Sequence, residues 1–555
     1  MKHLKFLLLF FIISACSPVE SIPTIIFHNA DLITMDESNP FGEAIAIAGD
    51  QILKVGLNDE ILSLADENTQ IIDLNGLTMT PGFIDSHTHR TPQRGKWGFS
   101  TIEESTLEWV SQGWTGLVEL SVGENELNEM IAADAAGELH TRINAFLQVN
   151  TFGGDPLGDW YQQYEPHQQF SPYLRIAGLK IFIDFDSGRV QNFTQNELND
   201  FIRQRQLEGW HVAVKAVGIQ SHNLALNAYE YAMDDDLNGD YRYRIEHSVG
   251  SSDEQVARMA DLGIIASIQT SFPAQIWGWE DIRNLSEEQG FENMFQWHNY
   301  VDSGMMIVAS PLNPPQLGTP EGNEEYLNDS HVSVMGLLYR SVTQIGPGGT
   351  PPESWMLERA ALSVNELLPM LTINGAYGTF EEDVKGSLTP GKWADLVILS
   401  DNPLVVQAND IKDIKVLMTM VGGQAEYCAA GQEQFCPNGE KSMAEGFSPV
   451  LGDWAAVDSD GSFMTLLVLE NPDKSYNIIL FDEGARACGM NQSGESYRAI
   501  QANGRGTANG NILELIGASG ICAESNTEIT FDLFFTYDPL SDTLLDNTGV
   551  TWKRD

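Results

Sequence analysis

The chain has 555 residues with 30 Lys and Arg against 78 Asp and Glu, which gives a formal net charge of −48. This length exceeds a single domain of roughly 100–200 residues, and the acidity excludes a basic surface for nucleic acid or for anionic lipid. A hydrophobic share of 42% excludes global disorder, because it is enough to build large cores.

The N-terminus has the pattern of an export signal. Lys2 and Lys5 precede an apolar run, 6–13, that is too short to cross a bilayer as a helix but suits a signal-peptide core. The following Ile-Ser-Ala-Cys, which ends at Cys16, resembles the lipobox of bacterial lipoproteins. We therefore expect residues 1–15 to be a removed signal, and the exported protein to be lipid-anchored to the bacterial cell envelope through Cys16. The alternative is an ordinary signal peptide with Cys16 near the cleavage site by chance.

Strand-like and helix-like patterns then divide the chain. Between residues 22 and 72, short β-type runs separated by turn residues predict a small β unit. Between residues 80 and 378, apolar runs alternate with amphipathic helical stretches, which predicts an α/β fold, a (β/α)8 TIM barrel. A doubly wound open sheet is the alternative, but no Gly-x-Gly-x-x-Gly follows an early strand. The eight expected barrel strands are Phe83–His87, Leu117–Leu120, Ile143–Val149, Leu179–Ile183, Val212–Val217, Tyr243–His247, Ile264–Ile268 and Met306–Ala309.

The residues after the barrel are again of β type. Strand-like runs up to residue 427 look like a return to the first β unit, so we expect a small composite β domain from 16–79 and 379–427 around a barrel of 80–378. Residues 428–445 have the composition of a linker, and 446–555 are rich in strand and hairpin signals. We therefore predict a separate all-β domain at the C-terminal end.

The cysteines agree with export. Without Cys16 an even number remains, which suits disulfides in an oxidising compartment. The most local pairing is Cys428 with Cys436 and Cys488 with Cys522, and we expect these two bridges. A zinc site from the same four residues is the weaker interpretation, because no Cys-x-x-Cys pair occurs.

The most informative segment is Thr-Pro-Gly-Phe-Ile-Asp-Ser-His-Thr-His at 80–89. Side chains two apart on a strand point the same way, so His87 and His89 would both face the barrel mouth at the end of the first strand. Two neutral imidazoles there can hold one divalent metal ion. The position of the pair after a Pro-Gly and a barrel strand makes a metal site the favoured interpretation.

With these residues the chain resembles the metal-dependent amidohydrolase superfamily, in its amidohydrolase 3 branch. The resemblance also rests on the Gly-Leu-Lys-Ile-Phe-Ile-Asp of 178–184, on the Arg-Ile-Glu-His of 244–247, and on segments 371–377 and 385–404. It implies a (β/α)8 barrel with a small flanking β domain. It further implies a metal site in which Lys180 stands for a strand-four Lys that is often carboxylated, and His247 for a strand-six His. The competing hypotheses are a salt bridge of Lys180 with Asp184 or Asp186 and a hydrogen-bonded core position for His247.

Two positions depart from the family pattern. Lys215 stands where the family has a metal-binding His on strand five, and Pro311 stands where it has an Asp after strand eight. An ammonium at Lys215 would repel a second metal ion, or occupy its place as a fixed positive charge near a developing oxyanion; the alternative is a lysine paired with a mouth carboxylate. A catalytic base would then come from Asp184, Glu119 or Glu246.

Three hypotheses of function follow. The favoured one is a hydrolase of carbon–nitrogen bonds in non-peptide or cyclic amides, with a small-molecule substrate. It would use one, or at most two, divalent metal ions, with zinc expected, on His87, His89, Lys180 and His247, assisted by Lys215 and Asp184. The second is a degenerate relative that binds a ligand without turnover. The third is a lipid-anchored adhesion or carbohydrate-binding protein whose C-terminal aromatics line a sugar platform. Nucleic acid is not an expected partner, and the membrane is contacted through Cys16 alone.

Overall fold

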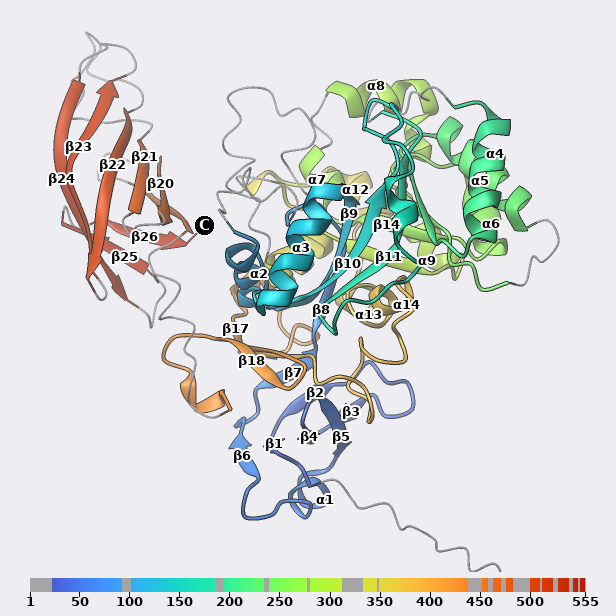
Figure 1. Cartoon of the computed structure of the whole chain (residues 1–555). Coiled ribbons are helices and arrows are strands. Elements are labelled where there is room, and N and C mark those ends of the chain that lie inside the picture. The colour runs from blue at the N-terminus through green and yellow to red at the C-terminus, as the bar shows by residue number, and fades with distance from the viewer. Residues whose placement is uncertain are drawn as a thin grey trace, which may run out of the picture.

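The computed structural model describes residues 22–91, 101–185, 193–233, 239–276, 280–311, 333–346, 349–437, 452–457, 463–470, 476–482, 500–509, 512–522, 528–538, 543–547 and 550–554. Within these ranges the chain forms an eight-stranded parallel sheet, two smaller sheets and a closed C-terminal barrel (Figure 1). No helix among the described residues has the length and apolarity needed to cross a bilayer. The predicted signal segment and Cys16 lie outside the described residues.

The parallel sheet confirms the predicted (β/α)8 barrel, and each predicted strand overlaps an observed one. The strands follow one another in chain order, every neighbouring pair is parallel, and the two edge strands adjoin. The strands are β8 (Phe83–Thr88), β9 (Trp114–Val122), β10 (Arg142–Gln148), β11 (Leu174–Phe182), β12 (Val212–Ala216), β13 (Arg244–His247), β14 (Ile265–Gln269) and β15 (Ile307–Ser310). Its helices are α2 (Ile102–Ser111), α3 (Glu124–Ala136), α4 (Gln195–Leu207), α5 (Ile219–Met233), α6 (Asp253–Asp261), α7 (Phe272–Ile276), α8 (Glu280–Gln289), α9 (Trp297–Asp302), α11 (Val334–Thr343), α12 (Ser354–Arg359), α13 (Val364–Met370) and α14 (Ile373–Tyr377).

Local sequence signals explain where several of these helices begin. Thr101, Thr194, Ser252 and Ser363 each accept the backbone N–H three residues on, and the Glu or Gln there reaches back to the capping residue. These capping boxes satisfy backbone donors that have no partner inside the helix.

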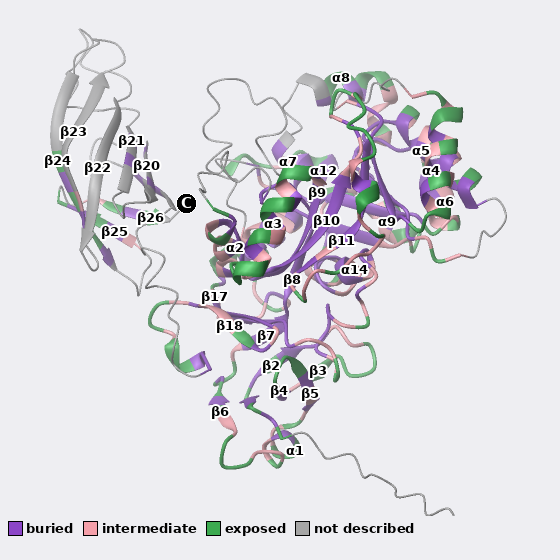
Figure 2. Ribbon diagram, in the orientation of Figure 1, coloured by how far each residue is buried: buried purple, intermediate pink, exposed green. Residues whose placement is uncertain are grey.

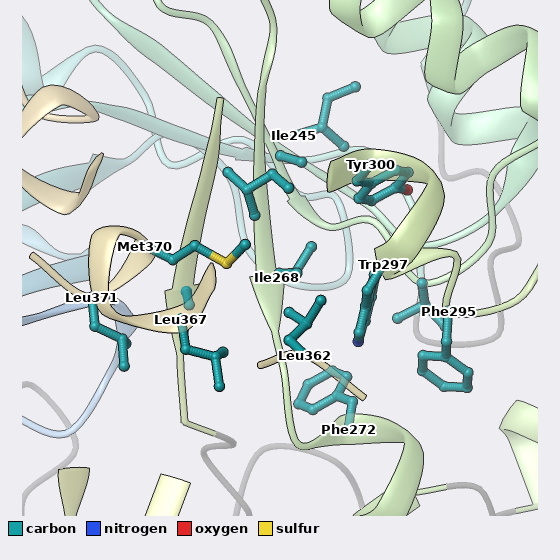
Figure 3. Close-up of a cluster of buried hydrophobic side chains, with 14 of the residues drawn as sticks. Ile245, Ile268, Phe272, Phe295, Trp297, Tyr300, Leu362, Leu367, Met370 and Leu371 are labelled. Carbon is teal, nitrogen blue, oxygen red and sulfur yellow. The ribbon is translucent and has the colours of Figure 1, made fainter. Parts of the chain in front are cut away.

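The barrel core is apolar because its strands are covered on both faces. The strands are mostly buried, whereas the outer helices alternate buried and exposed faces (Figure 2). Side chains from β13 and β14 meet those of the surrounding helices and loops in one apolar cluster (Figure 3). Its members include Ile245, Ile268, Phe272, Phe295, Trp297, Tyr300, Leu362, Leu367, Met370 and Leu371.

The end of α13 and the start of α14 together bridge the two edge strands. The Ile84 N–H on β8 donates to the carbonyl of Leu371 at 2.7 Å, and Asn374 Nδ2 donates to the carbonyl of Ile307 on β15 at 2.9 Å. Gly375 permits this approach, because a Cβ there would stand 3.0 Å from the Cβ of Ile84. One backbone donor of β8 and one backbone acceptor of β15 thus find partners where the barrel closes.

The two small sheets draw strands from both flanks of the barrel, as predicted. One sheet has the strand order β5-β4-β1-β6 and the other has the order β18-β17-β16-β7-β2-β3. In the second sheet β7, which precedes the barrel in the sequence, pairs antiparallel with β16, which follows it. Their elements are β1 (Ile25–His28), β2 (Asp31–Ile33), β3 (Phe41–Gly42), β4 (Ala44–Ala48), β5 (Gln51–Gly56), α1 (Asn58–Leu62), β6 (Gln70–Asp73), β7 (Thr78–Pro81), β16 (Leu396–Leu399), β17 (Val416–Val421) and β18 (Gln424–Cys428).

A buried ion pair joins this composite domain to the barrel. Arg142 at the start of β10 donates from Nε and from Nη2 to the two oxygens of Asp395, each at 2.8 Å. Its guanidinium also lies 3.8 Å from the ring centroid of Trp393. A planar guanidinium suits this bidentate and stacked arrangement, which a Lys would not reproduce.

The C-terminal residues form a closed antiparallel barrel. Its strands are β19 (Gly452–Val457), β20 (Phe463–Glu470), β21 (Tyr476–Asp482), β22 (Ile500–Asn509), β23 (Ile512–Cys522), β24 (Glu528–Asp538), β25 (Thr543–Asp546) and β26 (Thr551–Arg554). Trp454, Phe535, Tyr537 and Trp552 are buried in its core, and Trp552 Nε1 donates to Asp546. These four aromatics, which were among six considered for a sugar platform, therefore do not line one. Of the other two, Phe534 is 37% exposed, and the burial of Tyr476 lies outside what the structure describes, so a platform at these two positions stays a prediction.

The Cys428–Cys436 disulfide that the sequence predicts is present, and both residues are buried against the composite β domain. Cys488 lies outside the described residues, so the Cys488–Cys522 bridge stays a prediction.

Candidate functional site

The two histidines at the end of β8 face one another inside the barrel. His87 and His89 are both buried, and their Nε2 atoms lie 3.2 Å apart. Strand alternation brings them to the same face, as the sequence pattern predicts. Burial lowers the pKa of His87 to about 4 and that of His89 well below its usual value, so both imidazoles are neutral near pH 7.

The tautomers of these histidines are set by acceptors at the other ring nitrogen. His87 Nδ1 lies 2.6 Å from Glu246 Oε2, and His89 Nδ1 bonds to the backbone carbonyl of Leu120. A neutral imidazole has one N–H, and these partners can only accept it, so both Nε2 atoms carry lone pairs. Two lone pairs that face each other at 3.2 Å are held together best by a cation.

Glu246 is itself held by Arg244, two residues earlier on β13. Arg244 Nε donates to Glu246 Oε1 at 2.8 Å, and Nη2 also donates to the carbonyl of Ser86 at 2.7 Å. Burial alone would raise the pKa of Glu246, but the Arg244 charge and the bond from His87 hold it well below its usual value. The sequence suggested Glu246 as a base but not as the residue that orients His87. The available signal was that Arg244 and Glu246 are two residues apart on one strand, so their side chains lie on the same face and can pair.

The side chain of His247 also lies beside His87, although the backbone at His247 is not that of a regular strand. Its ring centroid lies 4.6 Å from that of His87, and its Nδ1 lies 2.9 Å from Gln269 Oε1. Neighbouring strand residues should face opposite ways, yet Glu246 and His247 both contact His87. His247 has φ +75° and Ser248 φ +45°, and this left-handed backbone turns the imidazole inward. Such strain is typical of functional sites.

Lys180 on β11 is fully buried, and its Nζ has no hydrogen-bond partner among the described residues. Burial lowers its pKa to about 7, because the charged ammonium is costly there. The predicted alternative, a salt bridge with Asp184, is wrong, because Asp184 pairs with a different lysine; Asp186 lies outside the described residues. An uncharged Lys180 amine is the form that can react with carbon dioxide to give an oxygen ligand.

Lys215 at the end of β12 forms the ion pair with Asp184. Its Nζ lies 3.2 Å from Asp184 Oδ1, and both side chains are buried. The other carboxylate oxygen accepts the Val217 N–H at 2.6 Å and the Ser221 hydroxyl at 2.5 Å. With the Gly218 N–H at 3.4 Å, Asp184 accepts from at least four donors, which disfavours it as a free base. The alternative in which Lys215 pairs with a mouth carboxylate is the arrangement observed.

Two more carboxylates are buried beside the histidine pair. Burial raises the pKa of Asp85 to about 7 and that of Glu119 to about 8. Asp85 Oδ1 accepts the His87 N–H at 3.1 Å, and Glu119 Oε1 accepts the Thr91 N–H at 2.8 Å. These bonds hold the backbone before and after the two histidines, and Glu119 is fully buried rather than on the surface.

The residues present fit a metal ion in part. In the part of the chain that the structure describes, no three His, Cys, Asp or Glu side chains form a complete metal-binding group. The convergent Nε2 atoms of His87 and His89 supply two ligands. The unpartnered Lys180 Nζ and the neighbouring ring of His247 are the groups that can complete the set. β15 ends at Ser310, and the last described residue after it is Pro311.

Known proteins share this architecture. The model of the amidohydrolase family matches residues 96–309 and 327–427, a stretch that begins after the histidine pair. The N-substituted formamide deformylase of Arthrobacter pascens is 22% identical over 553 residues, which cover 73% of this chain and 98% of that protein. A metal-dependent hydrolase from Pyrococcus horikoshii superposes with a TM-score of 0.57 at 16% identity, covering 69% of this chain and 99% of the other. A metal-dependent hydrolase from Pyrococcus furiosus superposes with a TM-score of 0.55 at 17% identity. That match covers 68% of this chain and 99% of the other. The structural likenesses show the fold.

Proposed function

Because the chain belongs to the amidohydrolase family, we propose that it is a metal-dependent hydrolase of carbon–nitrogen bonds in non-peptide amides. His87 and His89 hold one divalent ion, with zinc the expected element, and Lys180 and His247 complete its ligands. The observation that carries this proposal is the convergent Nε2 pair, whose two Nδ1 atoms are committed to Glu246 and to the Leu120 carbonyl. When bound, the metal supplies the acidity that makes water a nucleophile near pH 7 and the Lewis acidity that polarises an amide carbonyl.

The remaining residues of the site act by position and charge. Glu246 keeps the His87 proton on Nδ1, so that Nε2 stays available. Lys215 places a fixed ammonium in the site, where it disfavours a second cation and stabilises negative charge that develops on a carbonyl oxygen. Asp184 positions that ammonium through their 3.2 Å contact.

Metal analysis of the purified protein is the first test. We expect about one zinc per chain, lost in His87→Ala and retained in the control His28→Ala, a histidine at the end of β1 in the composite domain. No bound metal in the wild type would overturn the proposal. N-substituted formamides are the first substrates to assay, because the Arthrobacter pascens relative is named for them.

A second function is favoured by one observation, namely the absence of a strand-eight carboxylate at Pro311. A protein that binds zinc and an amide but hydrolyses no member of an amide panel would be a ligand-binding relative without turnover. Zinc binding with measurable hydrolysis that depends on His87 would exclude this alternative.

We also propose that the protein is exported and anchored by a lipid at Cys16, on the strength of the lipobox-like sequence. Labelling of cells with an alkyne fatty acid should mark the wild type and not Cys16→Ser. Equal labelling of both proteins would contradict the anchor.

A further inference from the structure

Three phenylalanines gather where β10 and β11 end. The ring of Phe152, in the loop after β10, lies edge-to-face against Phe182 at 5.6 Å and against Phe185 at 6.1 Å between ring centroids. Phe182 is the last residue of β11, and Phe185 follows Asp184. We call these three residues the aromatic wall.

The aromatic wall borders the candidate site directly. Lys215 Nζ lies 5.2 Å from the centroid of the Phe152 ring, and Lys180 Nζ lies 5.4 Å from that of Phe182. Both rings therefore lie next to the lysines that the proposed reaction uses. The loop after β10 is at the carboxyl face of the barrel, where barrel enzymes bind their substrates.

The wall combines a supported ring with exposed apolar area. Phe152 is 42% exposed, whereas Phe182 is 6% exposed. Phe182, Phe185 and the Lys215 ammonium all contact Phe152 within the protein, so its ring is held before any ligand arrives. Binding to a preorganised ring loses little side-chain entropy, and covering its exposed part removes apolar area from water.

We propose that the aromatic wall binds an uncharged aromatic substituent of the amide substrate. The wall offers edge-to-face partners to another ring and no hydrogen-bond donor or acceptor of its own. A cationic substituent there would be repelled by the Lys215 ammonium, and an anionic one would have to compete with Asp184, which already pairs with that ammonium. The inference rests on the proposed function in that it names the substrate class of the same site.

Binding of two ureas tests the proposal without requiring turnover. Ureas carry an amide-like carbonyl and resist hydrolysis, so we would titrate benzylurea and methylurea by calorimetry into the zinc-loaded protein. We expect the wild type to bind benzylurea at least about tenfold more tightly, as one apolar contact of this size supplies. Phe152→Ala should lose most of this ratio, and Phe152→Tyr should keep it.

The matched control is Phe41→Ala, because Phe41 is another exposed Phe, on β3 of the composite domain. It should leave the ratio of affinities unchanged. A wild type that binds both ureas equally or binds neither, or a Phe152→Ala protein that keeps the full ratio, would overturn the proposal. A protein that prefers benzylurea through Phe152 but hydrolyses no amide would retain the aromatic wall and lose the hydrolase assignment.

Discussion

Replacing Glu246 by Gln changes one atom in the chain of contacts that sets the His87 tautomer. In the wild type, Glu246 accepts from His87 Nδ1 and from Arg244 Nε. An amide has a single acceptor oxygen, and Arg244 can only donate, so the oxygen turns to Arg244 and the amide N–H2 turns to His87. His87 Nδ1 must then accept, its proton moves to Nε2, and the metal-facing lone pair is lost.

Two magnitudes follow from this geometry. Loss of the group that orients a metal-binding His lowers metal affinity about 10–100-fold. The substitution also leaves the buried Arg244 without its counter-charge, which costs about 3–5 kcal/mol in the free energy of unfolding. The exposed pair of Lys54 with Glu60, at 2.6 Å, is the matched control. Glu60→Gln should cost less than about 1 kcal/mol, because water screens that pair.

The assay is zinc competition with a chromophoric chelator, together with urea unfolding of the metal-free proteins at pH 7. Glu246→Gln should have both a lower zinc affinity and a lower free energy of unfolding than the wild type, whereas Glu60→Gln should change neither quantity by a comparable amount. A folded Glu246→Gln protein whose zinc affinity stays within about twofold of the wild type would refute the role given to Glu246.

Three further predictions concern other parts of the chain. The unfolded chain holds the Lys180 proton up to pH 10.5, whereas the folded protein releases it near pH 7, so the free energy of unfolding of metal-free wild type should rise between pH 7 and 10. Lys180→Met should remove this rise when the free energy of unfolding is measured by urea titration across that pH range. If the free energies of wild type and Lys180→Met changed with pH in parallel, the prediction would be refuted. Replacing Cys428 and Cys436 by Ser should lower the free energy of unfolding by about 2–3 kcal/mol, which thermal unfolding would detect as a lower Tm. Addition of a reductant should lower the Tm of the wild type and leave that of the double Ser variant unchanged. Trp297→Ala, in the core of Figure 3, should cost about 3–5 kcal/mol in urea unfolding, against less than about 1 for the exposed Leu357→Ala.

Much of the barrel could be predicted because its signals are local. Apolar runs such as Val212–Ala216 mark buried strands wherever they fold, and capping residues such as Thr194 mark helix starts. The alternation of strand side chains likewise placed His87 and His89 on one face. The same rule would put His247 on the face opposite to Glu246, because it assumes a regular strand, and the positive φ at His247 breaks that regularity.

The sequence by itself determined the elements, their order and the residue types available to the site. Only the tertiary structure decided how those residues pair: Lys215 with Asp184, Glu246 with His87, and Phe152 against Lys215. These contacts join residues on different strands or on the loops that follow them, where several donors and acceptors compete within a few ångströms. Burial makes an unpaired charge or polar group costly, so the packing of the whole barrel, rather than any local pattern, selects each partner.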